Sequence, residues 1–125
     1  MKFAFVLLTA LALTGAAVMQ NAYGQEKGPN GGPQEDIAGV DAELLISGNT
    51  ITFNIFDEDA KSVSTKGFVG SVLVVSGADR ETLTLTPFGE NSLKGDAKKP
   101  IAPGAAITLT MKTAAGKSGQ AKFKH

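Results

Sequence analysis

The sequence of 125 residues contains no cysteine, and its single histidine, His125, is the last residue. The absence of cysteine excludes a disulfide scaffold, an iron–sulfur cluster, a catalytic thiol and a lipid anchor on an N-terminal cysteine. With one terminal histidine, neither a Ser–His–Asp nor a Cys–His catalytic device can be assembled around a positioned base. The formal net charge of +0 lacks the basic excess typical of nucleic-acid-binding proteins. These absences predict a chain that is not an enzyme and does not bind nucleic acid.

The N-terminal segment has the organisation of a secretory signal peptide. Lys2 precedes an apolar run from Phe3 to Leu13, and Ala22-Tyr23-Gly24 places small residues where a signal peptidase prefers them. The alternative is a retained membrane anchor, because about 17 mostly apolar residues approach the length that spans a bilayer. The compact apolar core and the small-residue site favour cleavage. We therefore predict a signal peptide over residues 1–24 and a mature chain without a stable membrane anchor.

The mature chain is predicted to begin with a Gly/Pro-rich extended arm over residues 25–35. Glu26 to Pro33 contains two prolines and three glycines, which exclude a helix or a central strand. After the arm almost every segment has the pattern of a β-strand, and no window has the apolar spacing of a helix. We expect short strands, separated by turn signals, over residues 42–47, 50–56, 62–68, 71–75, 82–86, 92–94, 106–112 and 120–124.

Alternation within these segments predicts which side chains face the core. Strict alternation places Ile51, Phe53 and Ile55 on one face, whereas the continuous apolar run 71–75 indicates a strand covered on both faces. Two later segments place their inward residues at Ile107, Leu109, Met111, Ala121 and Phe123. Seven or eight strands at intervals of about 8–12 residues predict an all-β fold. We predict that residues 36–125 form an antiparallel immunoglobulin-like β-sandwich of about seven strands, with a small β-barrel as the alternative.

Several motifs spread over the mature chain form a recognisable set. They are Gly28-Pro-Asn-Gly-Gly-Pro33, Asp36-Ile-Ala-Gly39, Ala42-Glu-Leu44, Phe56-Asp-Glu-Asp-Ala-Lys61, Leu83-Thr-Leu-Thr-Pro87, Asn91-Ser-Leu93 and Gly116-Lys-Ser-Gly-Gln-Ala-Lys-Phe123. This set resembles a group of small proteobacterial periplasmic proteins. Their β-sandwich-like module is also similar to an N-terminal region of the periplasmic adaptor subunits of heavy-metal efflux systems. The resemblance implies localisation in the periplasm and a role in metal-ion homeostasis or efflux.

The resemblance also implies where metal ligands would lie. Members of the group commonly have histidine at the positions that correspond to Lys27, Asp41 and Glu58 here. Lysine is a cation and a poor ligand at neutral pH, whereas the two acids keep oxygen donors with less preference for soft metals. If a divalent metal ion is the cofactor, its predicted ligands are Asp41, Glu43, Asp57 and Glu58.

Each of these motifs also has a purely structural interpretation. Asp57-Glu58-Asp59 lacks the spacing of a calcium loop, which favours a solvated hairpin turn. Gly31, Gly32 and Gly39 either supply positive φ or contact a ligand. Lys117–Lys124 is either a strand that faces a partner or an edge that lysines guard against aggregation.

The predicted function is that of a non-enzymatic periplasmic accessory or binding module linked to metal-ion homeostasis or efflux. A metal-efflux component or another envelope protein is the expected partner. The alternative is an envelope interaction or structural module without a metal ligand, which docks its partner through a strand edge or the arm. A carboxylate-dependent hydrolase is a third hypothesis, which requires two carboxylates in one concave pocket.

Charge is distributed unevenly along the mature chain. Residues 25–60 contain eight acidic side chains and one basic side chain, Lys27, whereas residues 61–125 contain ten basic and four acidic side chains. In a sandwich, early and late strands often lie together, so we expect the two regions to neutralise each other. If they do not, the molecule has an acidic pole and a basic pole.

Overall fold

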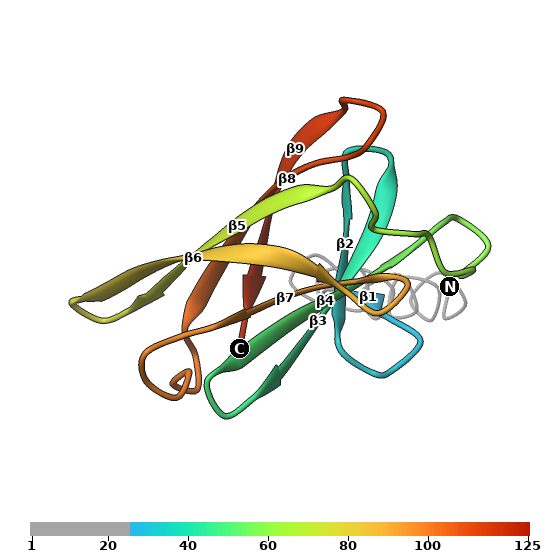
Figure 1. The fold of residues 1–125 in the computed structure, drawn as a ribbon. Helices are drawn as coiled ribbons and strands as arrows, with labels where there is room; N and C mark the ends of the chain where they lie inside the picture. The colour runs from blue at the N-terminus through green and yellow to red at the C-terminus, as the bar shows by residue number, and fades with distance from the viewer. Residues whose placement is uncertain (1–25) are drawn as a thin grey trace, which may run out of the picture.

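A computed structural model of the chain describes residues 26–125, which form nine β-strands and no helix (Figure 1). The predicted signal segment, residues 1–24, lies outside the described residues. Within residues 26–125 no helix is long and apolar enough to cross a membrane. The strands are β1 (Glu26–Lys27), β2 (Pro33–Ile37), β3 (Val40–Ser47), β4 (Thr50–Phe56), β5 (Val69–Ser76), β6 (Asp79–Phe88), β7 (Ser92–Asp96), β8 (Ala106–Lys112) and β9 (Ser118–Lys124).

All nine strands belong to one antiparallel sheet in the order β1-β2-β3-β4-β7-β6-β5-β8-β9, which curls into a half-barrel. Strand β6 joins the two halves of the sheet, because its residues 79–85 pair with β5 and its residues 86–88 pair with β7. The predicted all-β antiparallel fold is therefore confirmed. The finer prediction of a seven-stranded sandwich is not confirmed, since hydrogen bonding continues through β6 instead of dividing the strands into two sheets.

The two ends of the curled sheet approach each other where β2 meets β9. A Cβ atom at Gly119 would lie 3.0 Å from the backbone nitrogen of Ala38 and 3.2 Å from Cγ1 of Ile37. Only glycine allows so close an approach without a shift of the neighbouring chain. No ladder pairs β2 with β9, because β2 pairs with β1 and β3, and β9 pairs with β8. The sheet consequently curls without closing into the small barrel that was the alternative prediction.

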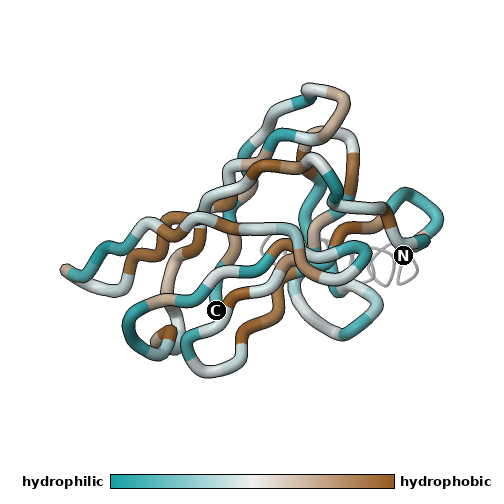
Figure 2. The backbone as a smooth tube through the Cα atoms, in the orientation of Figure 1, coloured by the Kyte–Doolittle hydropathy of each residue, from teal (hydrophilic) through white to brown (hydrophobic). Residues whose placement is uncertain are grey.

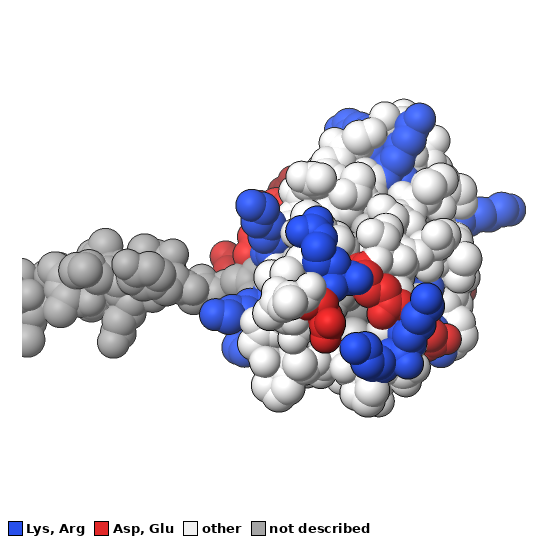
Figure 3. Space-filling model, turned by 90° about the vertical axis from the view of Figure 1, so that its left-hand side faces the viewer, with Lys and Arg blue, Asp and Glu red and all other residues white. Residues whose placement is uncertain are grey.

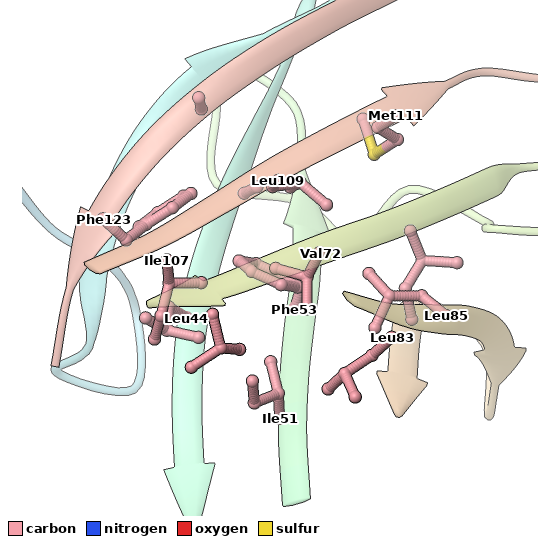
Figure 4. Packing of buried hydrophobic residues seen from close by; sticks show 14 of the residues in the cluster. Leu44, Ile51, Phe53, Val72, Leu83, Leu85, Ile107, Leu109, Met111 and Phe123 are labelled. Carbon is pink, nitrogen blue, oxygen red and sulfur yellow. The ribbon is translucent and has the colours of Figure 1, made fainter. Parts of the chain in front are cut away.

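The core lies inside the curl and follows the predicted alternation (Figures 2 and 4). Ile51, Phe53 and Ile55 of β4 are fully buried, and so are the inward residues of β8. Met111 is 1% exposed, which confirms its prediction as a core residue. The rings of Phe53 and Phe123 lie 5.3 Å apart between centroids with a tilt of 58°. This contact ties β4 to β9 across the interior, in a geometry that aromatic pairs favour.

Two segments differ from their predicted local structure. Of the arm expected over residues 25–35, residues 26–35 form β1, a turn and the start of β2, which make the outermost hairpin of the sheet, and residue 25 lies outside the described residues. Pro33 is tolerated there because it is the first residue of its strand. Residues 62–68, expected to be a weak strand, form only one bridge, between Ser62 and Phe56. Thr65 and Gly67 interrupt the face that Val63 begins, and Gly67 has a positive φ of 80°, which is not strand conformation.

Strand β5 also differs from its prediction, because only one of its faces is covered. Val72 and Val74 are buried in the core, whereas Leu73 and Val75 on the outer face are only half-buried. Val69, at the start of the same outer row, is 65% exposed. The curled sheet supplies one layer of packing, and no second layer lies over β5 within residues 26–125. An apolar stripe therefore remains on the outside of a central strand.

Candidate functional site

Glu43 is a fully buried carboxylate in β3 that holds the loop between β1 and β2. Its Oε2 accepts hydrogen bonds from the backbone nitrogens of Asn30 and Gly32, each at 2.8 Å. Its Oε1 accepts a hydrogen bond of 2.9 Å from Nδ2 of Asn30. A buried carboxylate needs such partners, because its desolvation would otherwise cost several kcal/mol. Glu43 is thus a structural anchor for the loop 28–32.

Two glycines of this loop, Gly28 and Gly32, are required by close approach to Glu43 and β3. A Cβ atom at Gly28 would lie 2.5 Å from Cδ of Glu43, and one at Gly32 would overlap the carbonyl oxygen of Leu44. Of the glycines predicted to supply positive φ, Gly31 and Gly39 do so, at 84° and 85°. Gly32 is not among the residues with positive φ, so close packing is the reason for glycine there.

A second group of acids lies on the outer surface near the turn between β2 and β3. Asp36 and Asp41 are cross-strand partners, and both border a shallow surface hollow together with Glu58. The pKa of Asp41 is raised from 3.8 to about 6. The largest cause is a hydrogen bond between its protonated form and Asp36, followed by partial burial and by the negative charges of Asp36, Glu26 and Glu58. We call Glu26, Asp36, Asp41 and Glu58 the acidic edge.

The four predicted metal ligands do not converge on one point. Asp41 and Glu58 border the same hollow, whereas the oxygens of Glu43 accept the bonds from the loop 28–32. Oδ1 of Asp57 accepts hydrogen bonds from the backbone nitrogens of Asp59 and Lys61 within its own turn. Within residues 26–125 no group of three or more His, Cys, Asp or Glu side chains is arranged to hold a metal ion. The set of four ligands stays a prediction.

The pairing of Asp36 with Asp41 bears on the hydrolase hypothesis. A carboxylate whose pKa is raised towards neutrality by a second carboxylate is one requirement of general acid–base catalysis. Catalysis further requires a cleft that encloses the substrate and excludes water. The hollow beside Asp41 is open to solvent and bordered by five residues, Asp36, Gly39, Val40, Asp41 and Glu58. The geometry therefore gives the hydrolase hypothesis less support than a binding role.

The substitution Asp41→Asn is expected to stabilise the protein at neutral pH. The folded pKa of about 6 lies above the ordinary value of 3.8, so stability falls as the pH rises from about 4 through 6. Asparagine carries no charge at any pH. After allowance for solvent screening, we expect a gain of about 1 kcal/mol at pH 7.5 and almost none at pH 4. Urea denaturation at both pH values measures this, with Asp59→Asn in the exposed turn as the control. Equal destabilisation at both pH values would contradict it.

A surface with threonine at many of its positions lies on the outside of β6, β5, β8 and β9. Cross-strand pairing aligns the outward residues of these four strands in rows. We call this surface the threonine face; its residues are Val69, Ser71, Leu73, Val75, Arg80, Thr82, Thr84, Ala106, Thr108, Thr110, Lys112, Ser118, Gln120, Lys122 and Lys124. Threonine flanks the apolar stripe of β5 on both sides, because β6 and β8 carry it at alternate positions.

Sequence reasoning placed Glu43 among metal ligands and missed its bonds to Asn30 and Gly32. The signal was present, because an acid that stands between the apolar residues Ala42 and Leu44 needs hydrogen-bond partners if it is buried. A binding role for the threonine face was not predicted, because alternation shows which residues point outwards but not whether a second layer covers them. Compared with protein-family models, curated proteins and solved structures, the chain matches none.

Proposed function

We propose that the mature chain is a non-enzymatic accessory module of the periplasm that binds a partner protein through the threonine face. The observation that carries this proposal is the outer side of β5, where Val69 is exposed and Leu73 and Val75 are only half-buried. A central strand with apolar residues on both faces is typical of a sheet that is covered on both sides. A partner seated over this stripe would remove apolar surface from water, which favours association.

Further features support this proposal over a catalytic role. The chain has one histidine, at its C-terminus, and three hollows within residues 26–125, beside Lys98, Glu90 and Asp41, are open to solvent. The periplasmic location is inferred from the signal segment over residues 1–24 and from the family resemblance. Metal handling is a further proposal that rests on that resemblance. Calorimetric titration of the mature protein with copper, zinc, nickel and calcium ions tests it, and the absence of heat with every ion would exclude it.

Site-specific photo-crosslinking in intact cells tests the partner-binding proposal. A crosslinking amino acid at Thr84, which is exposed in the threonine face, is expected to give a recurrent product of defined mass that mass spectrometry identifies. The control places the same amino acid at Glu90, which is exposed in the turn between β6 and β7. Recovery of monomer alone from the Thr84 probe, or identical products from both probes, would contradict partner binding through this face.

A further inference from the structure

Asn30 is the one asparagine of the sequence that is followed by glycine. The backbone nitrogen of the residue after an asparagine can attack the carbonyl carbon of its side chain, and glycine allows this best because it has no Cβ atom in the way. The other asparagines precede alanine, threonine, isoleucine and serine, whose Cβ atoms hinder the same attack. Asn30 and Gly31 are also exposed, so water reaches them. The pair Asn30-Gly31 is therefore the place where this chain most readily loses a side-chain amide.

The folded loop restrains both groups that would take part in this reaction. Nδ2 of Asn30, the leaving group, donates a hydrogen bond of 2.9 Å to Oε1 of Glu43. The backbone nitrogen of Gly31, the attacking group, donates one of 2.9 Å to the carbonyl oxygen of Gly28. The backbone nitrogen of Asn30 donates to Oε2 of Glu43 at 2.8 Å. The attack consequently requires the loop to open first, because the nitrogen of Gly31 must give up the proton that it shares with Gly28.

We propose that Asn30 is a deamidation site which Glu43 protects, and that its reaction releases the loop 28–32 irreversibly. The nitrogen of Gly31 loses its proton and forms a bond to Cγ of Asn30, the bond from Cγ to Nδ2 breaks, and Nδ2 leaves with that proton as ammonia. Water then opens the five-membered imide. Hydrolysis at Cγ gives aspartate at residue 30, and hydrolysis at the backbone carbonyl gives isoaspartate. Water is the only other reactant, and nothing is oxidised or reduced.

The product reverses the character of the contact with Glu43. An amide that donates to a buried carboxylate is replaced by a second carboxylate, and two carboxylates at hydrogen-bond distance cannot both remain ionised. On the face that Figure 3 shows, acidic side chains lie beside basic ones, as Oδ2 of Asp79 lies 3.4 Å from Nζ of Lys99. At residue 30 the new carboxylate is instead placed against Glu43, which is fully buried and cannot turn away. The loop must then either take up a proton or move off β3.

Release of the loop changes the outer surface of β3. Gly32 is buried against this strand, where a Cβ atom on it would lie 3.0 Å from Cδ2 of Leu45. Glu43 is held by the same loop, so its departure exposes an acid and an apolar side chain together. The lost amide is not restored, and the change therefore records the age of the molecule. The threonine face lies on other strands, so this inference does not depend on the proposed function.

Mass spectrometry of the purified protein during incubation at mildly alkaline pH measures the reaction at residue 30. We expect the folded wild type to deamidate at least about tenfold more slowly than the wild type unfolded in guanidinium chloride, because only the open loop reacts. Without denaturant, Glu43→Ala should deamidate at least about tenfold faster than the wild type, and Glu43→Gln at an intermediate rate. Glu90→Ala, which removes an exposed carboxylate, is the matched control and should react like the wild type.

Three results would overturn protection by Glu43 or attack by Gly31. The first is an equal rate in the folded and the unfolded wild type. The second is a rate in Glu43→Gln no faster than in Glu90→Ala, which decides the matter even if Glu43→Ala does not fold. The third is an unchanged rate in unfolded Gly31→Ala, because the added Cβ atom should slow an attack by this residue.

Asn30→Asp installs one product of the reaction and tests its consequence. Hydrogen exchange of the Gly32 amide, which donates to Glu43 at 2.8 Å, shows whether the loop is held. At neutral pH we expect this amide to exchange at least about tenfold faster in Asn30→Asp than in the wild type. Asn30→Asp/Glu43→Gln places an amide opposite a carboxylate again, with the two groups interchanged, so its exchange should be slower than in Asn30→Asp alone. Wild-type exchange in Asn30→Asp, or exchange in the double variant as fast as in the single one, would overturn release of the loop.

Discussion

Glu43→Ala is expected to lower the free energy of unfolding by about 3 kcal/mol, because it removes the acceptor of three hydrogen bonds. The backbone nitrogen of Gly32 is buried, so water cannot readily replace the carboxylate oxygen that it loses. The loop 28–32 should then detach from β3, since its other bonds lie mostly within the loop itself, between Gly28 and Gly32 and between Gly31 and Gly28. Urea denaturation followed by far-ultraviolet circular dichroism measures the loss.

Two further variants separate this anchoring role from a general effect of removing charge. Glu43→Gln keeps one oxygen that can accept from Gly32, and the side-chain amide of Asn30 can turn to offer its own oxygen. Glu43→Gln should therefore lower the free energy of unfolding by less than half as much as Glu43→Ala. Glu90→Ala removes an exposed carboxylate whose side chain makes no hydrogen bond within residues 26–125, and should change stability by no more than about 0.5 kcal/mol. Equal losses for Glu43→Ala and Glu90→Ala would show that Glu43 is not an anchor.

The strands and the core could be predicted from sequence because side-chain alternation has a direct physical cause. In a strand, successive side chains point to opposite sides, so the residues that must be buried stand at every second position. Ile51, Phe53 and Ile55 follow this rule and are fully buried, and so are Ile107 and Leu109. The turn at Gly48 was also predictable, because the positive φ of 60° that it adopts is accessible to glycine without strain.

The curl of the sheet could not be predicted in the same way. Alternation says nothing about which strands pair, and β6 changes its partner from β5 to β7 within one strand. The apolar run of β5 was interpreted as covered on both faces because a buried strand and an exposed apolar stripe have the same local pattern. The distinction depends on whether another layer exists, which is a property of the whole chain and its partners. The outer side of β5, which was predicted to be covered, therefore has no covering layer within residues 26–125.

The candidate site was predictable in part. Asp41 and Glu58 do border one hollow, although they are 17 positions apart in the sequence. Asp36 was not among the predicted residues, because its place opposite Asp41 depends on the register between β2 and β3. The role of Glu43 depends on the fold of a loop that its composition had marked only as an arm. Long-range register and loop placement thus decide which acids act together, and neither is encoded in local spacing.

Gly32→Ala is expected to lower the free energy of unfolding by about 3 kcal/mol, although alanine is the smallest change available. The added Cβ atom would overlap the carbonyl oxygen of Leu44, which belongs to the backbone of β3 and cannot turn away. The loop cannot shift freely either, because the nitrogen of Gly32 donates to Glu43 and its oxygen accepts from Gly28 at 2.7 Å. Relief of the overlap therefore requires the loss of at least one of these hydrogen bonds.

Gly31→Ala is the matched control, because it makes the same chemical change one residue away. Apart from its two chain neighbours, no atom of residues 26–125 lies within 4 Å of a Cβ at Gly31, so only its positive φ of 84° opposes alanine. That strain costs about 1 kcal/mol. Urea denaturation should therefore give Gly32→Ala a clearly lower free energy of unfolding than Gly31→Ala. The values for Gly32→Ala and Glu43→Ala should be close, because both substitutions detach the same loop. A larger loss of unfolding free energy for Gly31→Ala than for Gly32→Ala would contradict this prediction. It would mean that backbone conformation, and not close packing on β3, is the reason for glycine in the loop.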